Sequence, residues 1–437
     1  MVIRVGKNGA DFCTVQDAIN AVPFCEKAEI VIGEGLFHEK LFCEKKDIVI
    51  TGAGMDRTII DFDDYANEVM EDGNKRGTFR TYTAFFGGDR IEVRNMTIRN
   101  SAGDGRVVGQ ALAVYTDAKL CYFENVKMVG CQDTLFCAPL PLAERQVGGF
   151  LGPRAFSGRR MTRQYFKSCE IRGDIDFIFG GADAVFDDCN IICNDMHHGK
   201  GLEPKTVSVR ADGDGAGNAD KTGAVVVGQN DVKATVAGAG AAGTGQNDAK
   251  ATVAGAGAKA AGGERQLDKD QIDVNERPLN GFITAACGQK EGLGFVFRNC
   301  TIGGVKGCEP GTVFLGRPWR EEARSVFLNC TMDETIAPER FSGWGGITKD
   351  EPDTFYGEFG TKIMGGYAGE AVSGAANHGD KSNGLANSGK YADLSKKNPW
   401  VKDIDEKLAA ELSARADEVV GAVRSGFRSD LTNGILA

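Results

Sequence analysis

The stretch that decides the fold is FKSCEI, residues 166–171, because it recurs twenty residues later as FDDCNI, residues 186–191. The shared pattern is an apolar residue, two mostly polar residues, a cysteine or small apolar residue, a polar residue, and isoleucine or methionine. Four further copies are VRNMTI (93–98), FENVKM (123–128), FRNCTI (297–302) and FLNCTM (327–332). These copies are rich in Phe, Ile and Val, as is typical of β-strands.

The spacing of the copies predicts a solenoid. Their first residues are 30, 43, 20, 111 and 30 residues apart, and short repeats of roughly 20–30 residues indicate the coils of one stack. Helical patterns between the copies are scarce, whereas βα units would need a helix between parallel strands. We therefore expect an all-β fold, a parallel β-helix.

The repeat also explains many of the thirteen cysteines. Cys169, Cys189, Cys300 and Cys330 all occupy its fourth position, where we expect them to stack as small buried apolar groups. An odd number of cysteines without a visible export signal favours reduced thiols over disulfides. The cysteines and the four histidines form no metal-ligand spacing, so we expect no metal and no cofactor.

The repeats also divide the chain. We expect a β-helix domain at residues 1–364, a loop-rich linker at 365–396, and a helical segment at 397–437. The two long spacings imply insertions at about 138–162 and 195–280. The second insertion is rich in Gly and Ala and contains a duplicated phrase, so we expect it to be a flexible excursion.

Helical periodicity marks one segment near each end of the chain. TVQDAINAV, residues 14–22, places its apolar residues on one helical face, and we expect it to cap the open end of the solenoid. The segment beginning DIDEKLAAEL, residues 403–412, has the same periodicity. We expect it to pack along the flank of the solenoid, with a role in dimerisation as the alternative.

Composition restricts the partners. The net charge is −10 with no dense stripe of Lys and Arg, so we expect no nucleic acid partner. No apolar stretch is long enough to span a membrane, and no signal peptide is visible. We therefore expect a cytoplasmic protein, or a secreted one if an upstream segment is missing. Separately, we expect a monomer.

Two aspartates stand in unusually apolar surroundings. Asp133 in GCQDTLF and Asp176 in GDIDFIFGG each lie ten residues after the first residue of their repeat copy, Phe123 and Phe166. Equal offsets in adjacent coils bring residues side by side, about 4.8 Å apart. Two carboxylates so close cannot both ionise freely, and this favours an acid paired with a nucleophile. Otherwise, each aspartate could simply cap a turn or pair with a basic residue.

A fixed cation is available for such a buried carboxylate. Arg317 lies in the apolar stretch FLGRPW, just before the copy at 327–332. A planar guanidinium can hold a carboxylate through two hydrogen bonds and so keep it charged.

At this point the sequence resembles a known family. VGQALAVYTD (108–117), GCQDTLF (130–136), RQYFKSCEIRGDIDFIFGGADAVFDDCNI (163–191) and LGRPW (315–319) are similar to the signature segments of the pectin methylesterases. They occur in the order and at the spacing of that family. The resemblance extends from residue 2 to about residue 360, apart from the two insertions.

The resemblance implies a right-handed parallel β-helix that hydrolyses the C6 methyl esters of polygalacturonate or its oligomers to methanol and free uronate. It implies that Asp176 is the nucleophile, Asp133 the general acid and base, and Arg317 the residue that orients Asp176. It further implies that Gln110 and Gln132 stabilise the oxyanion. The aromatic residues that it implies for the sugar cleft are Phe179, Trp319, Trp344, Phe79 and Phe136.

Three departures from the family pattern stand out. Phe136 replaces a frequent tyrosine, and TAACGQ (284–289) matches the corresponding family segment only loosely. Asp174 stands where a threonine is common, which adds a third carboxylate on the same face as Asp176 if the strand is regular.

Two other functions remain open from the residues themselves. A glycosidase could use a carboxylate pair on the same kind of solenoid, and a solenoid could also bind polysaccharide without catalysis. Release of methanol without new reducing ends separates the esterase from the glycosidase. The presence of both aspartates, both glutamines and the arginine argues against a purely binding role.

Overall fold

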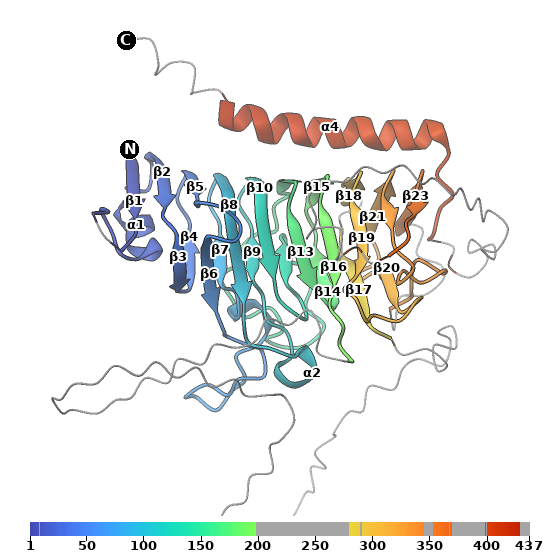
Figure 1. Cartoon of the computed structure of the whole chain (residues 1–437), viewed down its shortest axis with the longest axis horizontal. Helices are drawn as coiled ribbons and strands as arrows, with labels where there is room; N and C mark the ends of the chain where they lie inside the picture. Colours follow the sequence, from blue (N-terminus) through green and yellow to red (C-terminus); the bar gives the residue numbers. More distant parts are fainter. Residues whose placement is uncertain are drawn as a thin grey trace, which may run out of the picture. The chain divides into compact units, whose positions relative to one another are not determined.

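The structure is a computed structural model of the chain, and it describes residues 1–7, 9–197, 279–288, 291–344, 353–366, 368, 398 and 400–428. The predicted insertion at 195–280 and the predicted linker at 365–396 lie largely outside the described residues. The rest forms successive coils of parallel strands, which Figure 1 shows side by side from β1 (Val2–Val5) to β23 (Phe355–Phe359). The predicted all-β, parallel β-helix fold is confirmed.

The strands make three faces, and every neighbouring pair is parallel. The first face consists of β1, β2 (Lys27–Ile32), β5 (Asp47–Thr51), β8 (Arg90–Asn100), β10 (Leu120–Val129), β12 (Arg163–Lys167), β15 (Asp183–Asp187), β18 (Phe295–Arg298), β21 (Arg324–Leu328) and β23. The second consists of β3 (Gly35–His38), β6 (Thr58–Phe62), the later halves of β8 and β10, β13 (Glu170–Gly173), β16 (Asn190–Cys193), β19 (Thr301–Gly304), β22 (Thr331–Met332) and β24 (Lys362–Ile363). The third, which carries the candidate site, consists of β4 (Leu41–Cys43), β7 (Ala84–Phe86), β9 (Val114–Thr116), β11 (Leu135–Cys137), β14 (Ile175–Gly180), β17 (Gly281–Ala286) and β20 (Val313–Gly316).

The repeat copies pair in register. The first residues of consecutive copies are aligned partners: Val93 with Phe123, Phe123 with Phe166, Phe166 with Phe186, Phe186 with Phe297, and Phe297 with Phe327. The phrase therefore marks one turn of the solenoid each time it recurs, including across the two long insertions.

The third position of the repeat turns the chain between the first and second faces. Its occupants all have left-handed backbone conformations, with φ between 51° and 55°: Asn95, Asn125, Ser168, Asp188, Asn299 and Asn329. Short polar side chains, Asn and Asp above all, adopt this conformation more readily than other non-glycine residues. The third position, which the sequence pattern shows simply as polar, thus sets the corner of each coil.

The first position of the repeat fills the core with a column of parallel rings. Adjacent rings from Phe123 to Phe327 have centroids 4.4–5.0 Å apart and interplanar angles of 5–8°. The four cysteines of the fourth position are fully buried and unbridged, as predicted.

The N-terminal helix lies where the sequence predicted a cap. Helix α1 (Val15–Ala21) begins at Thr14, whose side chain accepts a hydrogen bond from the backbone N–H of Asp17. Its apolar face, Val15, Ala18 and Ile19, is buried in the same core as the first strands. The short elements η1 (Thr78–Arg80) and α2 (Gly105–Val108) lie in loops between coils.

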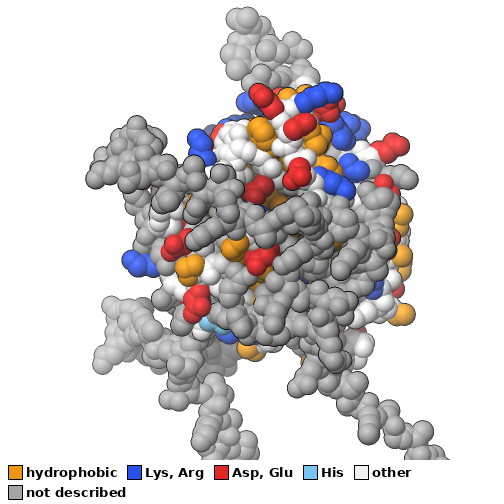
Figure 2. All heavy atoms as spheres, turned by 90° about the vertical axis from the view of Figure 1, so that its right-hand side faces the viewer, with side chains coloured by type: hydrophobic (Ala, Val, Ile, Leu, Met, Phe, Trp, Pro, Cys, Tyr) orange, Lys and Arg blue, Asp and Glu red, His pale blue; other side chains and the backbone are white. Residues whose placement is uncertain are grey.

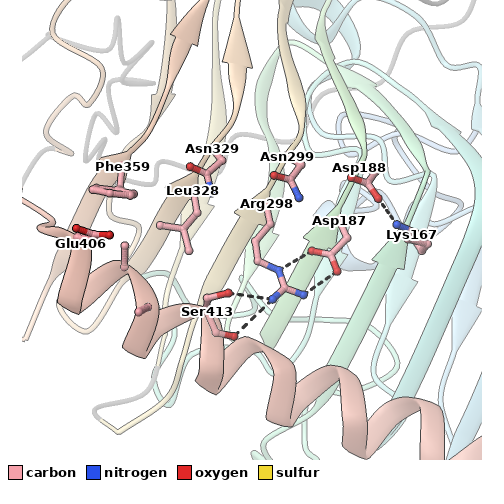
Figure 3. A pocket seen from close by; sticks show the side chains of 12 residues that line it. Lys167, Asp187, Asp188, Arg298, Asn299, Leu328, Asn329, Phe359, Glu406 and Ser413 are labelled. Atoms are coloured by element: carbon pink, nitrogen blue, oxygen red, sulfur yellow. Dashed lines mark hydrogen bonds and ion pairs between the residues drawn. The ribbon is translucent and has the colours of Figure 1, made fainter.

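The C-terminal helix packs along the flank, also as predicted. Helix α4 (Glu406–Arg428) runs across many coils (Figure 1) and buries Leu412, Ala416 and Val419 against the outer side of the first face. A cavity of about 460 Å³ lies beneath it. There Arg298 binds Asp187 of β15 at 2.7 and 2.8 Å and also contacts Ser413 of α4 (Figure 3).

The visible charges around α4 have both signs. Figure 2 looks onto the end of the solenoid that carries β23, and acidic and basic side chains intermix near α4 at the top of that view. In the part of the chain that the structure describes, no helix combines the length and apolar character needed to cross a membrane.

The phenylalanine column generates a stability prediction. Phe186 is fully buried between two neighbouring rings, so Phe186→Ala should lower the free energy of unfolding by about 3–5 kcal/mol through lost burial and a residual cavity. Urea denaturation measures this loss. Phe24→Ala, at a ring that is 64% exposed, is the control and should change it by less than about 0.5 kcal/mol. Equal effects at both positions would show that the column is not a tightly packed core.

Candidate active site

The two aspartates of the sequence prediction lie in matching register on adjacent coils. Strand β11 pairs with β14 so that Leu135 aligns with Ile178 and Phe136 with Phe179. Asp133 and Asp176 each precede those partners by the same number of residues. The backbone N–H of Asp133 donates to the carbonyl of Ile175 at 3.0 Å, which joins the two coils beside the acids.

Both aspartates have strained backbones. Their φ angles are 64° at Asp133 and 51° at Asp176, in a left-handed region that costs non-glycine residues free energy and is frequent at functional sites. Between Ile175 and Ile178, β14 contains one residue more than its partner β17, which makes Asp176 part of a bulge. Such bulges redirect a side chain from the regular strand direction.

In a regular strand the adjacent side chains of Gln132 and Asp133 would face opposite ways, so both reach one site only if the chain bends there. From the sequence the nearby Gly130 is a plausible place for this bend, but the residue with a left-handed backbone is Asp133 itself. Gly130 instead leaves space for Thr134, whose Oγ1 would lie 2.7 Å from a Cβ atom at that position.

Arg317 and Asp176 form the ion pair that their apolar surroundings require. The Nε atom of Arg317 donates to Oδ1 of Asp176 at 2.8 Å, and its Nη2 donates to Oδ2 at 2.7 Å. Asp176 is 5% exposed, so an unpaired charge there would be costly. The two parallel hydrogen bonds compensate that cost and fix the plane of the carboxylate.

The guanidinium of Arg317 is itself held between two aromatic rings. Its central carbon lies 3.9 Å from the ring centroid of Phe282 and 4.0 Å from that of Trp344. The backbone N–H of Arg317 donates to Thr284 on β17 at 2.9 Å. Phe282 is not identifiable from the sequence, because nothing in a buried apolar strand shows which ring will face a cation.

The two glutamines lie on coils that precede the nucleophile candidate. Gln132 is nearly buried and Gln110 is half-buried, and the carbonyl of Gln132 accepts from Ala111 N–H at 3.1 Å. The β-carbon of Gln132 packs against Gly105 of α2, where an added Cβ would come within 2.8 Å. Their oxyanion role stays a prediction.

The predicted aromatic residues gather in one cluster but differ in exposure. Phe79, Phe136 and Phe179 are 3%, 0% and 3% exposed, whereas Trp319 and Trp344 are half-buried at the edge of the cluster. Only the two tryptophans therefore present accessible surface in this structure.

Asp174 does not share a regular strand face with Asp176. It precedes β14, and its Oδ1 accepts a hydrogen bond from the backbone N–H of Ile175 at 2.7 Å. Burial raises its pKa to about 7, an effect that the hydrogen bond from Ile175 opposes. The charges of Asp104 and Asp176 raise this pKa further, whereas that of Arg106 lowers it. A proton is thus held near the nucleophile candidate up to neutral pH.

Comparison with known proteins identifies the family. The family model described as Pectinesterase matches residues 2–146, 159–247 and 274–388. Because these segments make up most of the chain, the chain belongs to the pectinesterase family. Pectinesterases are carboxylic ester hydrolases.

Two curated relatives from Arabidopsis thaliana show the extent of the similarity. "Probable pectinesterase/pectinesterase inhibitor 64" is 28% identical over 82% of this chain, which spans 45% of that protein's length. "Probable pectinesterase 8" is 27% identical over 93% of this chain, which spans 72% of that protein.

Solved structures share the fold. A pectin methylesterase from carrot aligns over 86% of this chain and 85% of its own, at 22% identity and a TM-score of 0.51. A pectin methylesterase solved in complex with a hexasaccharide aligns over 92% of this chain and 98% of its own, at 20% identity and a TM-score of 0.51. These matches support the right-handed parallel β-helix.

The buried Asp174 generates a pH prediction. The native state holds this proton up to about pH 7, whereas an unfolded aspartate loses it near pH 3.8. The contribution to stability is therefore complete below about pH 4 and is lost as pH rises to about 7, with an expected loss of order 2–4 kcal/mol. The asparagine of Asp174→Asn does not titrate, so the variant does not share this loss. Its free energy of unfolding relative to wild type should therefore rise between about pH 4 and about pH 7.

Urea denaturation of both proteins from acidic to mildly alkaline pH measures the difference. Asp63→Asn, at an exposed carboxylate, is the control for general charge effects. A pH-independent difference between wild type and Asp174→Asn would contradict the assignment.

Proposed function

We propose that this chain hydrolyses the C6 methyl esters of homogalacturonan or of methylated oligogalacturonides, giving methanol and free uronate. The observation that carries the proposal is the buried Asp176, bound twice by Arg317 and aligned with Asp133 on the adjacent coil. Membership of the pectinesterase family supports the same reaction. The hexasaccharide complex of a structural neighbour supports an oligosaccharide substrate.

In the proposed reaction Asp176 is the nucleophile. One of its carboxylate oxygens attacks the ester carbonyl carbon, which forms a tetrahedral oxyanion. Arg317 holds the plane of the carboxylate, and Phe282 and Trp344 restrict the movement of the guanidinium. Such positioning removes much of the entropic cost of bringing the reacting atoms together.

Gln110 and Gln132 are the proposed donors to the oxyanion. Within the described residues, neither side-chain amide has a hydrogen-bond partner, so both are available to a ligand. Amide donors held in position before the reaction stabilise developing negative charge more strongly than water, which must reorient.

Asp133 is the proposed general acid and base. It donates a proton to the departing methoxide as the carbon–oxygen bond breaks, and Asp176 is left as an acyl anhydride. Asp133 then takes a proton from the water that attacks this anhydride, and Asp176 is released with the uronate product. Its register on the coil adjacent to that of Asp176 supports access of this one residue to both steps.

The nucleophile assignment generates a direct prediction. Asp176→Asn retains the shape of the side chain but supplies no carboxylate, so methanol release should fall by at least roughly 1,000-fold. Thermal unfolding should still show a folded protein, and calorimetry should still detect binding of methylated oligomers. Asp63→Asn, remote in sequence and exposed, should retain full activity. Substantial turnover by folded Asp176→Asn would exclude it as the nucleophile.

The oxyanion assignment gives a separate prediction. Gln132→Ala should lower kcat by roughly 100- to 1,000-fold, because a preorganised donor is lost in the transition state. Its KM should change much less, since the ground-state ester needs that donor little. Steady-state methanol assays separate the two parameters. A variant with raised KM and normal kcat would assign Gln132 to substrate binding instead.

Location and assembly stay predictions. We expect a monomer in the cytoplasm, or outside the cell if an upstream segment exists. Light scattering of the purified protein and fractionation of the source cells would measure the two properties.

A further inference from the structure

The first insertion contains a segment that lies outside the family pattern. The family model leaves residues 147–158 unmatched, whereas the structure describes all of them, between β11 and β12. This segment carries Phe150, which is 7% exposed and belongs to the aromatic cluster of the candidate site. A segment that the family model leaves unmatched thus contributes to the aromatic cluster of the candidate site.

The aromatic cluster adjoins the catalytic residues because of strand register. Phe136 and Phe179 are each the third residue after Asp133 and Asp176, and they are aligned partners on β11 and β14. Phe79 lies 5.0 Å from Phe136 between ring centroids. These rings form a row, which we call the aromatic row, and two of them lie on the strands that follow the two acids.

Phe150 covers this row. Its ring centroid lies 5.8 Å from that of Phe79 and 6.4 Å from that of Trp319, with nearly perpendicular planes in both pairs. Gly152 packs so closely on the row that a Cβ atom there would lie 2.6 Å from the carbonyl oxygen of Phe79. The segment therefore contributes to the burial of Phe79, which in turn packs on Phe136 and Phe179 with ring centroids 5.0 and 6.2 Å away.

The segment is anchored at its far end. Arg154 forms ion pairs of 2.5 Å with Asp117, which follows β9, and with Glu44, which follows β4. Its guanidinium also lies 5.0 Å from the ring centroid of Phe85. Arg160, just beyond the segment, donates to the carbonyls of Gly88 and Asp117 at 2.8 and 3.0 Å. The cover is therefore held by several contacts along the third face.

These contacts have a consequence for a sugar chain. Pyranose rings bind protein through a few polar groups together with apolar and aromatic surface, and here Phe150 already packs on Phe79 and Trp319 of the aromatic cluster. A long polymer would need the surface that Phe150 covers to be open, because its chain extends past the reacting ester. A short oligomer would not need that surface.

We propose that residues 147–158 are a specificity segment that closes the cleft beside the aromatic row and makes the enzyme favour short methylated oligogalacturonides over the internal esters of long pectin. This inference rests on the proposed esterase function. Phe150 is the central residue of this segment, because its ring packs on the aromatic row where a sugar would otherwise stack.

Two variants open the row by different means. Phe150→Ala removes the covering ring, and Gly152→Ala displaces the segment through its clash with Phe79 while keeping every anchoring side chain. Phe156→Ala, in the same segment but 97% exposed, is the matched control. The measurement is kcat/KM for methanol release from a methylated trigalacturonide and from highly methylated polymeric pectin.

We expect the ratio of polymer to trimer kcat/KM to rise about tenfold or more in Phe150→Ala and Gly152→Ala, and to stay at the wild-type value in Phe156→Ala. An unchanged ratio in both opening variants would overturn the inference, as would a wild-type enzyme that already prefers polymer. If wild type releases no methanol from either substrate, the proposed function fails instead. The length preference is then tested by calorimetric binding of the same trimer and polymer, with the same expected order among the variants.

Discussion

The in-register stacking of successive coils is the constraint on which the rest of this structure depends. Parallel pairing aligns the first residue of each repeat copy with that of the next, and the left-handed third residue turns every coil at the same point. A residue's position in its coil therefore determines its neighbours on both sides. The core shows this as a column of stacked phenylalanine rings, and the candidate site shows it as two aligned aspartates.

The candidate site contains buried carboxylates that are stabilised in different ways. Asp176 is compensated by the two hydrogen bonds of Arg317, so its charge can be buried beside aromatic rings. Asp174 lacks such a cation at hydrogen-bonding distance among the described residues, and burial raises its pKa instead. Two acids that are close in sequence are thus placed in contrasting electrostatic surroundings, which is how one residue type can hold a charge at one position and a proton at another.

Insertions are tolerated because they leave the solenoid between coils and return to it in register. The first insertion separates β11 from β12, yet Phe123 still pairs with Phe166. A loop of this kind can change without disturbing the core, and the first insertion directly follows β11 of the third face, where the acids are. This arrangement separates the residues that the family model matches from segment 147–158, which the model leaves unmatched and which contacts the aromatic row.

Much of the fold and part of the site could be predicted from the sequence, because register in a solenoid is a matter of counting along the chain. The repeat predicted the parallel β-helix and the buried cysteines, and equal offsets of ten residues predicted that Asp133 and Asp176 would align. The apolar surroundings of Asp176 and Arg317 also predicted that the two side chains would form an ion pair. The catalytic roles assigned by family resemblance are still predictions.

The tertiary structure alone decided the features that depend on loop paths and on contacts between distant side chains. Among these are the bend at Asp133 rather than Gly130, the enclosure of Arg317 by Phe282 and Trp344, and the cover that Phe150 places over the aromatic row. No period or offset in the sequence encodes them. Strand register follows from local periodicity and repeated hydrogen bonding, whereas the packing of an inserted loop depends on the whole surface that it meets.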